Sequence, residues 1–248
     1  MRLSVVIIAF NESANIGACL DSVEFADERI VMDNGSTDGT QDIVLASGAR
    51  LAKTIDWPGF GPQKNRVLAL ATGDWVLSLD ADERVTPALQ AEIEEAMRNA
   101  DRAAYTLPRL SSFCGAPIRH GGWYPDRVLR LFPRGLGRFS DDLVHEKILT
   151  DLPVRGLRSN LLHESFRSFE SVLDKVNRYS TASAAGMLAK GRKGSFSVAI
   201  GHGAWAFIRT YIVKRGFLDG RMGLAVAISS AEGSYYRYLK LWLAQQTK

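Results

Sequence analysis

Apolar residues in the first hundred positions of this 248-residue chain form short continuous runs, separated by stretches with helical spacing. Residues 3–10 are an apolar run interrupted only by Ser4, rich in β-branched side chains, of the kind that is buried on both faces of a parallel sheet. From Ile16 to Val23 the apolar side chains recur every three or four positions, which predicts an amphipathic helix. Further strands are expected at 29–32, 50–54 and 75–79, with helices between them. This alternation predicts a doubly wound α/β sheet.

Glycine, proline and threonine mark the ends of these elements. The loop 34–40 opens the second helix, and Gly48 closes it. Pro62 is expected in the first turn of the third helix, while Thr86 and Pro87 are expected to cap and start the fourth. The turn residues therefore agree with the apolar periodicity.

Polar and acidic residues follow three of the predicted strands. Asn11 and Glu12 follow the first, Asp33 follows the second, and Asp80 and Asp82 follow the fourth. Ligands in open α/β sheets bind at the carboxyl ends of the strands. Residues two apart in a strand point to the same side, so Asp80 and Asp82 could face one cation. The alternative is an ordinary strand end followed by a helix cap.

Two basic residues, Lys64 and Arg66, lie close to the expected start of the third helix. Cations at this end oppose the helix dipole, which suggests that an anion such as a phosphate is bound nearby. The alternative is that both are simply exposed helix residues.

The charge of the chain is unevenly distributed. Residues 1–100 carry 8 Lys/Arg and 16 Asp/Glu and are acidic. Residues 101–248 carry 23 Lys/Arg and 11 Asp/Glu and are basic. The second part is therefore expected to face something anionic, such as phosphate, nucleic acid or a membrane surface, unless it is only a solvated basic face. Cys19 and Cys114 show no metal-like spacing and suit a reducing compartment.

Three motifs in order resemble the family 2 glycosyltransferases: the segments 5–12 (VVIIAFNE), 33–40 (DNGSTDGT) and 77–83 (LSLDADE). The resemblance implies the GT-A fold, a mixed α/β sheet flanked by helices that binds a nucleotide sugar. It also implies inverting transfer of a sugar to an acceptor hydroxyl. The segments 59–65 and 212–220 are similar to the lipopolysaccharide core β-glucosyltransferases, which implies UDP-glucose or a close analogue as donor and a glycan or lipid-linked acceptor.

The resemblance also implies roles for single residues. Asp33 would meet the base, Lys64 and Arg66 would lie near the diphosphate, and Asp80 and Asp82 would hold Mg²⁺ or Mn²⁺ through the nucleotide phosphates. The full set expected to bind the nucleotide sugar is Ala9, Phe10, Asn11, Glu12, Asp33, Gly35, Lys64, Arg66, Asp80 and Ala81.

The second half of the chain shows short strand patterns at 105–110, 127–132, 143–149 and 157–163, which should complete the sheet and build the acceptor side. The segment 139–147 is rich in acids. Direct displacement at an anomeric carbon needs a carboxylate near the attacking hydroxyl. Glu146 is the first candidate for this base and Asp142 the second, against the alternative of ordinary strand-edge charges.

His163 ends an apolar strand pattern and has two interpretations. It is either a structural histidine or a further metal or diphosphate contact.

Residues 168–190 have helical spacing, and a second apolar segment covers 196–213. His202 and Arg209 within that segment favour a helix lying in a membrane interface over one that spans the bilayer. Basic and aromatic residues around it favour an anionic membrane surface, with packing in a homodimer as the alternative.

These patterns predict a GT-A domain at 1–165, with a nucleotide-sugar half at 1–100 and an acceptor half at 101–165, and a helical extension at 166–248. The apolar run at the N-terminus is interpreted as a strand and not a signal peptide, so the expected location is cytoplasmic, on the inner face of the membrane.

Two other functions are compatible with parts of the sequence. A sugar-nucleotide synthesising or hydrolysing enzyme could use a similar sheet, but a nucleotidyltransferase would carry a Gly-rich phosphate loop after the first strand, where this chain has Asn11 and Glu12. A nucleic-acid-binding protein would explain the basic second half, but no recognition motif supports it.

Overall fold

The computed structural model describes residues 1–99, 102–141 and 146–246. The chain divides into two compact units. The first comprises residues 1–109 and 126–163, and the second comprises residues 110–125 and 164–248. The boundary between residues 165 and 166 that the sequence suggests stays a prediction.

The first unit is built on a mixed sheet with the strand order β3-β2-β1-β4-β8-β6-β12-β5. Its parallel part consists of β1 (Leu3–Ala9), β2 (Glu28–Asp33), β3 (Arg50–Lys53) and β4 (Trp75–Asp80). The other strands of the chain are β5 (Glu83–Val85), β6 (Ala104–Phe113), β7 (Ala116–Pro117), β8 (Asp126–Pro133), β9 (Arg138–Phe139), β10 (Ile148–Leu149), β11 (Val154–Gly156) and β12 (Leu161–Phe166). Of these, β9 and β10 form a separate two-stranded sheet, and β7 belongs to the second unit. The predicted mixed α/β sheet is therefore confirmed.

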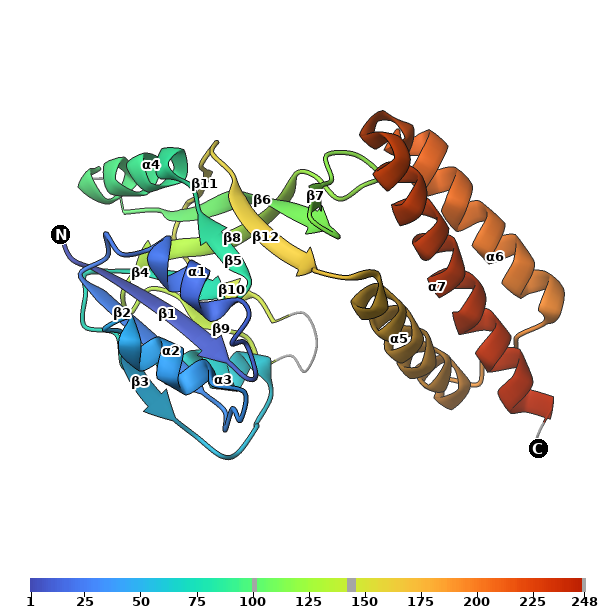
Figure 1. Cartoon of the computed structure of the whole chain (residues 1–248), viewed down its shortest axis with the longest axis horizontal. Coiled ribbons are helices and arrows are strands. Elements are labelled where there is room, and N and C mark those ends of the chain that lie inside the picture. The colour runs from blue at the N-terminus through green and yellow to red at the C-terminus, as the bar shows by residue number, and fades with distance from the viewer. Residues whose placement is uncertain (100–101, 142–145, 247–248) are drawn as a thin grey trace. The chain divides into compact units, whose positions relative to one another are not determined.

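Both faces of β1, β4 and the second half of β2 are buried, as the apolar runs predict, whereas β3 at the edge of the sheet is partly exposed. Successive residues of a strand point to opposite faces, so Val5 and Ile7 pack in one cluster with Leu20, while Val6 packs in another with Val67. The helices of this unit are α1 (Ile16–Asp21), α2 (Thr40–Ala46), α3 (Phe60–Leu68) and α4 (Pro87–Arg98). Figure 1 shows these elements in their chain order from blue to green.

The predicted cap of α4 is confirmed, because the Thr86 hydroxyl accepts a hydrogen bond of 3.2 Å from the backbone N–H of Leu89. Pro62 lies in the first turn of α3, as predicted. The helix begins at Phe60, however, so Lys64 lies beyond its first turn and Arg66 lies in its last turn. The argument from the helix dipole therefore does not apply to either cation.

The predicted strand at 157–163 is interrupted. β11 ends at Gly156 and β12 begins at Leu161. Between them the chain turns around the carboxylate of Glu92 on α4, which accepts hydrogen bonds of 2.7 Å and 3.1 Å from the backbone N–H groups of Arg158 and Ser159. The predicted strand at 143–149 is seen as Ile148–Leu149, and its residues 143–145 lie outside the described residues.

The helices of the second unit are α5 (Phe169–Ala189), α6 (Phe196–Ile208) and α7 (Gly220–Gln246), with a π-helical turn at Arg209–Val213 and a 3₁₀ turn at Gly216–Asp219. α5 and α6 both pack on α7. Figure 1 shows these long helices in brown, orange and red. Across the part of the chain that the structure describes, none of the helices is long and apolar enough to cross a membrane.

Candidate active site

The polar strand ends meet at one edge of the sheet because β1, β2 and β4 are parallel and in register. Asp33 is aligned with Ala9, and Asp80 is aligned with Ile8. Ala9 and Ala81 are buried beside these positions. The carboxyl ends of these strands therefore bring the predicted polar residues to one edge of the sheet, and their role in binding a nucleotide sugar stays a prediction.

The loops after β1 and β2 are tied together by hydrogen bonds. The backbone N–H of Asn11 donates to Ser36 Oγ at 2.8 Å, and the backbone N–H of Glu12 donates to Thr40 Oγ1 at 2.8 Å. In return, Asn11 Oδ1 accepts from the N–H of Thr37 at 3.0 Å. These contacts hold the loop in one conformation and leave the ring of Phe10 exposed.

Asp33 is fully buried and organises the loop that follows it. Its Oδ1 accepts hydrogen bonds from the backbone N–H groups of Gly35 and Ser36 at 3.0 Å and 2.9 Å, and from Gln41 Nε2 at 2.7 Å. Gly35 has a φ of 85°, which glycine adopts without strain. The contact of Asp33 with a nucleotide base stays a prediction.

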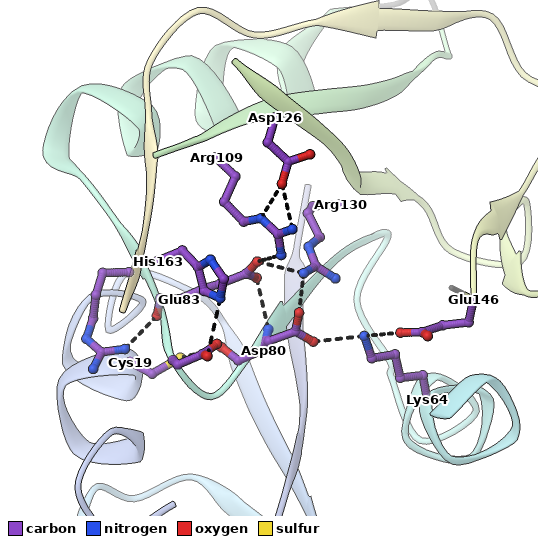
Figure 2. Close-up of polar contacts among 11 residues, drawn as sticks. Cys19, Lys64, Asp80, Glu83, Arg109, Asp126, Arg130, Glu146 and His163 are labelled. Carbon is purple, nitrogen blue, oxygen red and sulfur yellow. Dashed lines mark hydrogen bonds and ion pairs between the residues drawn. The ribbon is translucent and has the colours of Figure 1, made fainter. Parts of the chain in front are cut away.

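The last residue of β4, Asp80, is held by two cations (Figure 2). Its Oδ1 lies 2.8 Å from Lys64 Nζ, and its Oδ2 pairs with the guanidinium of Arg130. Burial would raise the pKa of Asp80, but the charges of Arg130 and Lys64 outweigh it and hold the pKa well below its usual range. Asp80 therefore stays ionised at any working pH.

A fully buried carboxylate, Glu83, lies behind Asp80. It is 2.6 Å from Arg130 and 3.3 Å from Arg109, and it accepts the backbone N–H of Asp80 at 3.0 Å. Arg109 in turn pairs with Asp126 at 2.6 Å (Figure 2). The carboxylates and guanidinium groups thus alternate, so each buried charge has a partner of opposite sign.

Sequence reasoning missed Glu83, Arg109 and Arg130. One signal was available for Arg130, because it stands between Leu129 and Leu131 in a predicted strand, where a charge must find a buried partner.

Lys64 connects Asp80 to the first candidate base. Its Nζ lies 2.8 Å from Asp80 Oδ1 and 2.8 Å from Glu146 Oε1, and the residue is only 4% exposed. The structure thereby brings Glu146 to the carboxyl edge of the sheet (Figure 2). The second candidate, Asp142, lies outside the described residues.

Asp82 lies in the turn after β4 and contacts a different group. Its Oδ2 is 3.3 Å from His163 Nε2. Asp80 and Asp82 therefore have different partners here, and their joint role as metal ligands stays a prediction. Within residues 1–99, 102–141 and 146–246 there is no group of three or more His, Cys, Asp or Glu side chains that could hold a metal.

Arg66 differs from Lys64, the other cation predicted at the diphosphate, because it does not contact Asp80 or Glu146. It is exposed and pairs with Asp56 at 2.6 Å. A role at the diphosphate stays a prediction for Arg66, and it would require this pair to separate.

Cys19 on α1 lies under the same edge. Its Sγ is 3.6 Å from the backbone carbonyl oxygen of Asp80, and burial raises the pKa of the thiol. A protonated, buried thiol is a poor nucleophile, so Cys19 is a packing residue.

Gly61 sets how closely α3 approaches the segment that carries Glu146. A Cβ at Gly61 would lie 1.9 Å from the backbone oxygen of Ser140. Gly61→Ala is therefore expected to lower the free energy of unfolding by about 1–3 kcal/mol, because backbone must move to admit the methyl group. Urea unfolding would measure this. The control is Gly186→Ala, where a helical Cβ meets nothing within 4 Å. Equal stability of the two variants would contradict the close contact.

The family model described as glycosyl transferase family 2 matches residues 4–146 of the chain. The chain therefore belongs to family 2 of the glycosyltransferases, and the mixed sheet with its flanking helices has the GT-A-like fold that the sequence predicts. The resemblance read from the three motifs is confirmed. Family membership also favours glycosyl transfer over sugar-nucleotide synthesis and nucleic-acid binding.

Among its relatives, the lipopolysaccharide core biosynthesis glycosyltransferase LpsC of Rhizobium meliloti is 31% identical, over 96% of this chain and 90% of that protein. An uncharacterised glycosyltransferase of Rickettsia typhi is 30% identical, over 97% of this chain and 86% of that protein. Among solved structures, glucosyl-3-phosphoglycerate synthase of Mycobacterium tuberculosis with Mn²⁺ and UDP-glucose is 29% identical, with a TM-score of 0.38, over 45% of this chain and 44% of that chain.

Proposed function

We propose that this enzyme is an inverting glycosyltransferase that moves a hexose from a nucleotide diphosphate sugar, with UDP-glucose as the first candidate, to a glycan or lipid-linked acceptor. Its pathway would be the synthesis of lipopolysaccharide or another cell-surface polysaccharide. The main support is the position of Lys64, whose ammonium lies 2.8 Å from both Asp80 and Glu146. This contact links Asp80, at the carboxyl edge of the sheet where the donor would bind, to Glu146, a carboxylate that can act as base.

The donor would lie across the carboxyl ends of β1, β2 and β4, in contact with the loop residues Phe10, Asn11 and Glu12. Lys64 is the cation best placed for the diphosphate, because its ammonium already lies between two anions at this edge. A phosphate oxygen could replace the Glu146 carboxylate as one of its partners, which would release Glu146 toward the acceptor.

Asp82 and His163 are the residues that would hold Mg²⁺ or Mn²⁺. They offer one carboxylate oxygen and one imidazole nitrogen 3.3 Å apart. This pair suits such an ion when nucleotide phosphates complete its ligands. Asp80 would assist from the end of β4. A bound ion would neutralise the charge of the departing diphosphate.

Glu146 would accept the proton of the acceptor hydroxyl. The hydroxyl oxygen then forms the bond to the anomeric carbon on the face opposite the diphosphate, the bond from that carbon to the diphosphate oxygen breaks, and the configuration inverts. Lys64 holds the carboxylate of Glu146 in place until the donor binds.

A panel of nucleotide sugars tests the donor, measured by calorimetry for binding and by release of free nucleotide for hydrolysis. UDP-glucose is expected to bind in the presence of Mn²⁺ and to be slowly hydrolysed without acceptor. Binding of a different nucleotide sugar would replace UDP-glucose in the proposal, and no binding to any of them would overturn it.

Glu146→Gln keeps the shape of the side chain and removes its basicity. It is expected to lower kcat by about a hundredfold or more and to leave donor binding intact, since loss of a general base costs at least this much. Steady-state kinetics and UDP calorimetry measure the two effects. Asp151→Asn, at an exposed carboxylate, is the control. Normal turnover of Glu146→Gln together with loss of activity in Asp142→Asn would move the assignment to Asp142.

The second unit would attach the enzyme to an anionic membrane surface on the cytoplasmic side. Exposed apolar side chains lie on and just after α6, and basic residues are abundant in the same unit. Large exposed side chains of this set are Ile200, Trp205, Ile208, Ile212 and Phe217.

The double variant Trp205→Ser, Ile208→Ser is expected to reduce co-sedimentation with phosphatidylglycerol vesicles at least tenfold, since burying each large apolar side chain is worth about 1.5–3 kcal/mol. Val154→Ser, at an apolar residue of similar exposure in the first unit, is the control. If sedimentation is unchanged and the double variant instead dissociates a homodimer in the ultracentrifuge, these residues form a dimer contact.

A further inference from the structure

An open groove of about 510 Å³ lies within the second unit, lined by residues of α5 and α7. Its floor is apolar. Phe113, Trp123 and Phe166 contact one another there, with ring centroids 5.8–6.2 Å apart, and Val172 and Val226 lie beside them. The volume is that of a small-molecule site, for which about 300–1,000 Å³ is usual.

The rim of the groove is basic and rich in hydroxyl groups. Lys175 and Arg237 line it, and none of the described lining residues is acidic. Lys175 Nζ lies 4.6 Å from the ring centroid of Phe166, directly above the apolar floor. The guanidinium of Arg237 makes no hydrogen bond or ion pair with any described residue.

Serine hydroxyls face the same groove from both helices. Four of them have no hydrogen-bond partner among residues 1–99, 102–141 and 146–246: Ser183, Ser229, Ser230 and Ser234. Polar groups placed around an apolar floor in this way give a ligand both orientation and specificity. The groove therefore matches a molecule with a hydrocarbon part and an anionic, hydrogen-bonding head.

We propose that this groove binds a single lipid molecule whose head group carries a phosphate. The hydrocarbon lies on the floor formed by Phe113, Trp123 and Phe166, and the phosphate pairs with Lys175 and Arg237. The head group also bonds to the serine hydroxyls. The identification of this lipid with the anchor of the acceptor rests on the proposed function, but its binding is tested without turnover.

The probe is dihexanoyl phosphatidylglycerol, used as a monomer and titrated into the full chain by calorimetry. Dihexanoyl phosphatidylcholine tests the need for net negative charge, and inorganic phosphate tests the need for hydrocarbon. We expect the phosphatidylglycerol to bind, the phosphatidylcholine to bind at least tenfold more weakly, and phosphate alone to give no heat of binding.

Two matched pairs of variants locate the site. Arg237→Gln is expected to weaken binding about tenfold, whereas Arg221→Gln, at an exposed cation of the same helix, should not. Gly233→Ala places a Cβ 3.8 Å from Val176, an ordinary contact, and should bind normally. Gly233→Leu extends into the groove and should abolish binding.

Each outcome decides the proposal. Equal affinity of Arg237→Gln and Gly233→Leu with the unchanged chain would overturn it, and so would equal binding of phosphate alone or no binding of phosphatidylglycerol. If Gly233→Leu does not fold, the Arg237 pair still decides. If these variants break a dimer in the ultracentrifuge and no lipid binds, the groove belongs to a contact between two copies.

UDP calorimetry on the same proteins tests the proposed function separately from the lipid site. If UDP does not bind, the proposed donor is wrong, but the result of the lipid titration is not affected.

Discussion

Glu83→Gln is expected to lower the free energy of unfolding by about 3–5 kcal/mol, although sequence reasoning gave Glu83 no role. The side chain is fully buried and balances the charges of Arg130 and Arg109. Removing one partner of a buried ion pair leaves an uncompensated buried charge, which is the costly change. Arg130 cannot relieve it by losing a proton. A guanidinium is not deprotonated in proteins, and the charge of Asp80 still favours its protonated form in this variant.

Urea unfolding followed by circular dichroism would measure this loss. Glu95→Gln, at an exposed carboxylate on α4, is the matched control and is expected to change stability by less than about 0.5 kcal/mol. If the two variants unfold at the same urea concentration, the Glu83 charge is not needed to balance the two arginines.

Asp82→Asn is expected to lower turnover about a thousandfold, the largest effect on activity in this chain. An ion at Asp82 and His163 would supply several kcal/mol of charge stabilisation, and each 1.36 kcal/mol is a factor of ten in rate. The amide keeps the size of the side chain and removes its negative charge. Calorimetry should also show that UDP affinity no longer depends on Mn²⁺.

The control for this experiment is Asp21→Asn, at an exposed carboxylate at the end of α1. His163→Gln should show the same loss of Mn²⁺ dependence, since it removes the other proposed metal ligand. A fully active Asp82→Asn, together with UDP affinity that EDTA does not alter, would remove the metal from the mechanism.

The parts of the fold that local sequence determines could be predicted. The apolar run of β1, the end of β2 at Asp33 and the cap at Thr86 all depend on neighbouring residues, and all are present. The break between β11 and β12 depends on Glu92, which reaches it from α4, more than sixty positions earlier. No local pattern reports such a contact.

The same limit applies to the site. The motifs identified the edge of the sheet and Asp80, because these follow from strand ends. The partners of Asp80 depend on the antiparallel pairing of β8 with β4 and on the approach of α3, neither of which the spacing of residues specifies. Lys64 was singled out for an anion, and the structure provides two carboxylates instead.

The burial of Cys19 has a practical consequence. The chain has two cysteines, and the thiol of Cys19 is enclosed and protonated, while Cys114 is partly accessible. Maleimide chemistry on the native protein should therefore place a fluorophore at Cys114 alone, which belongs to the second unit. An optical reporter can thus be attached without mutagenesis and without disturbing the edge of the sheet at which Asp80 and Lys64 meet.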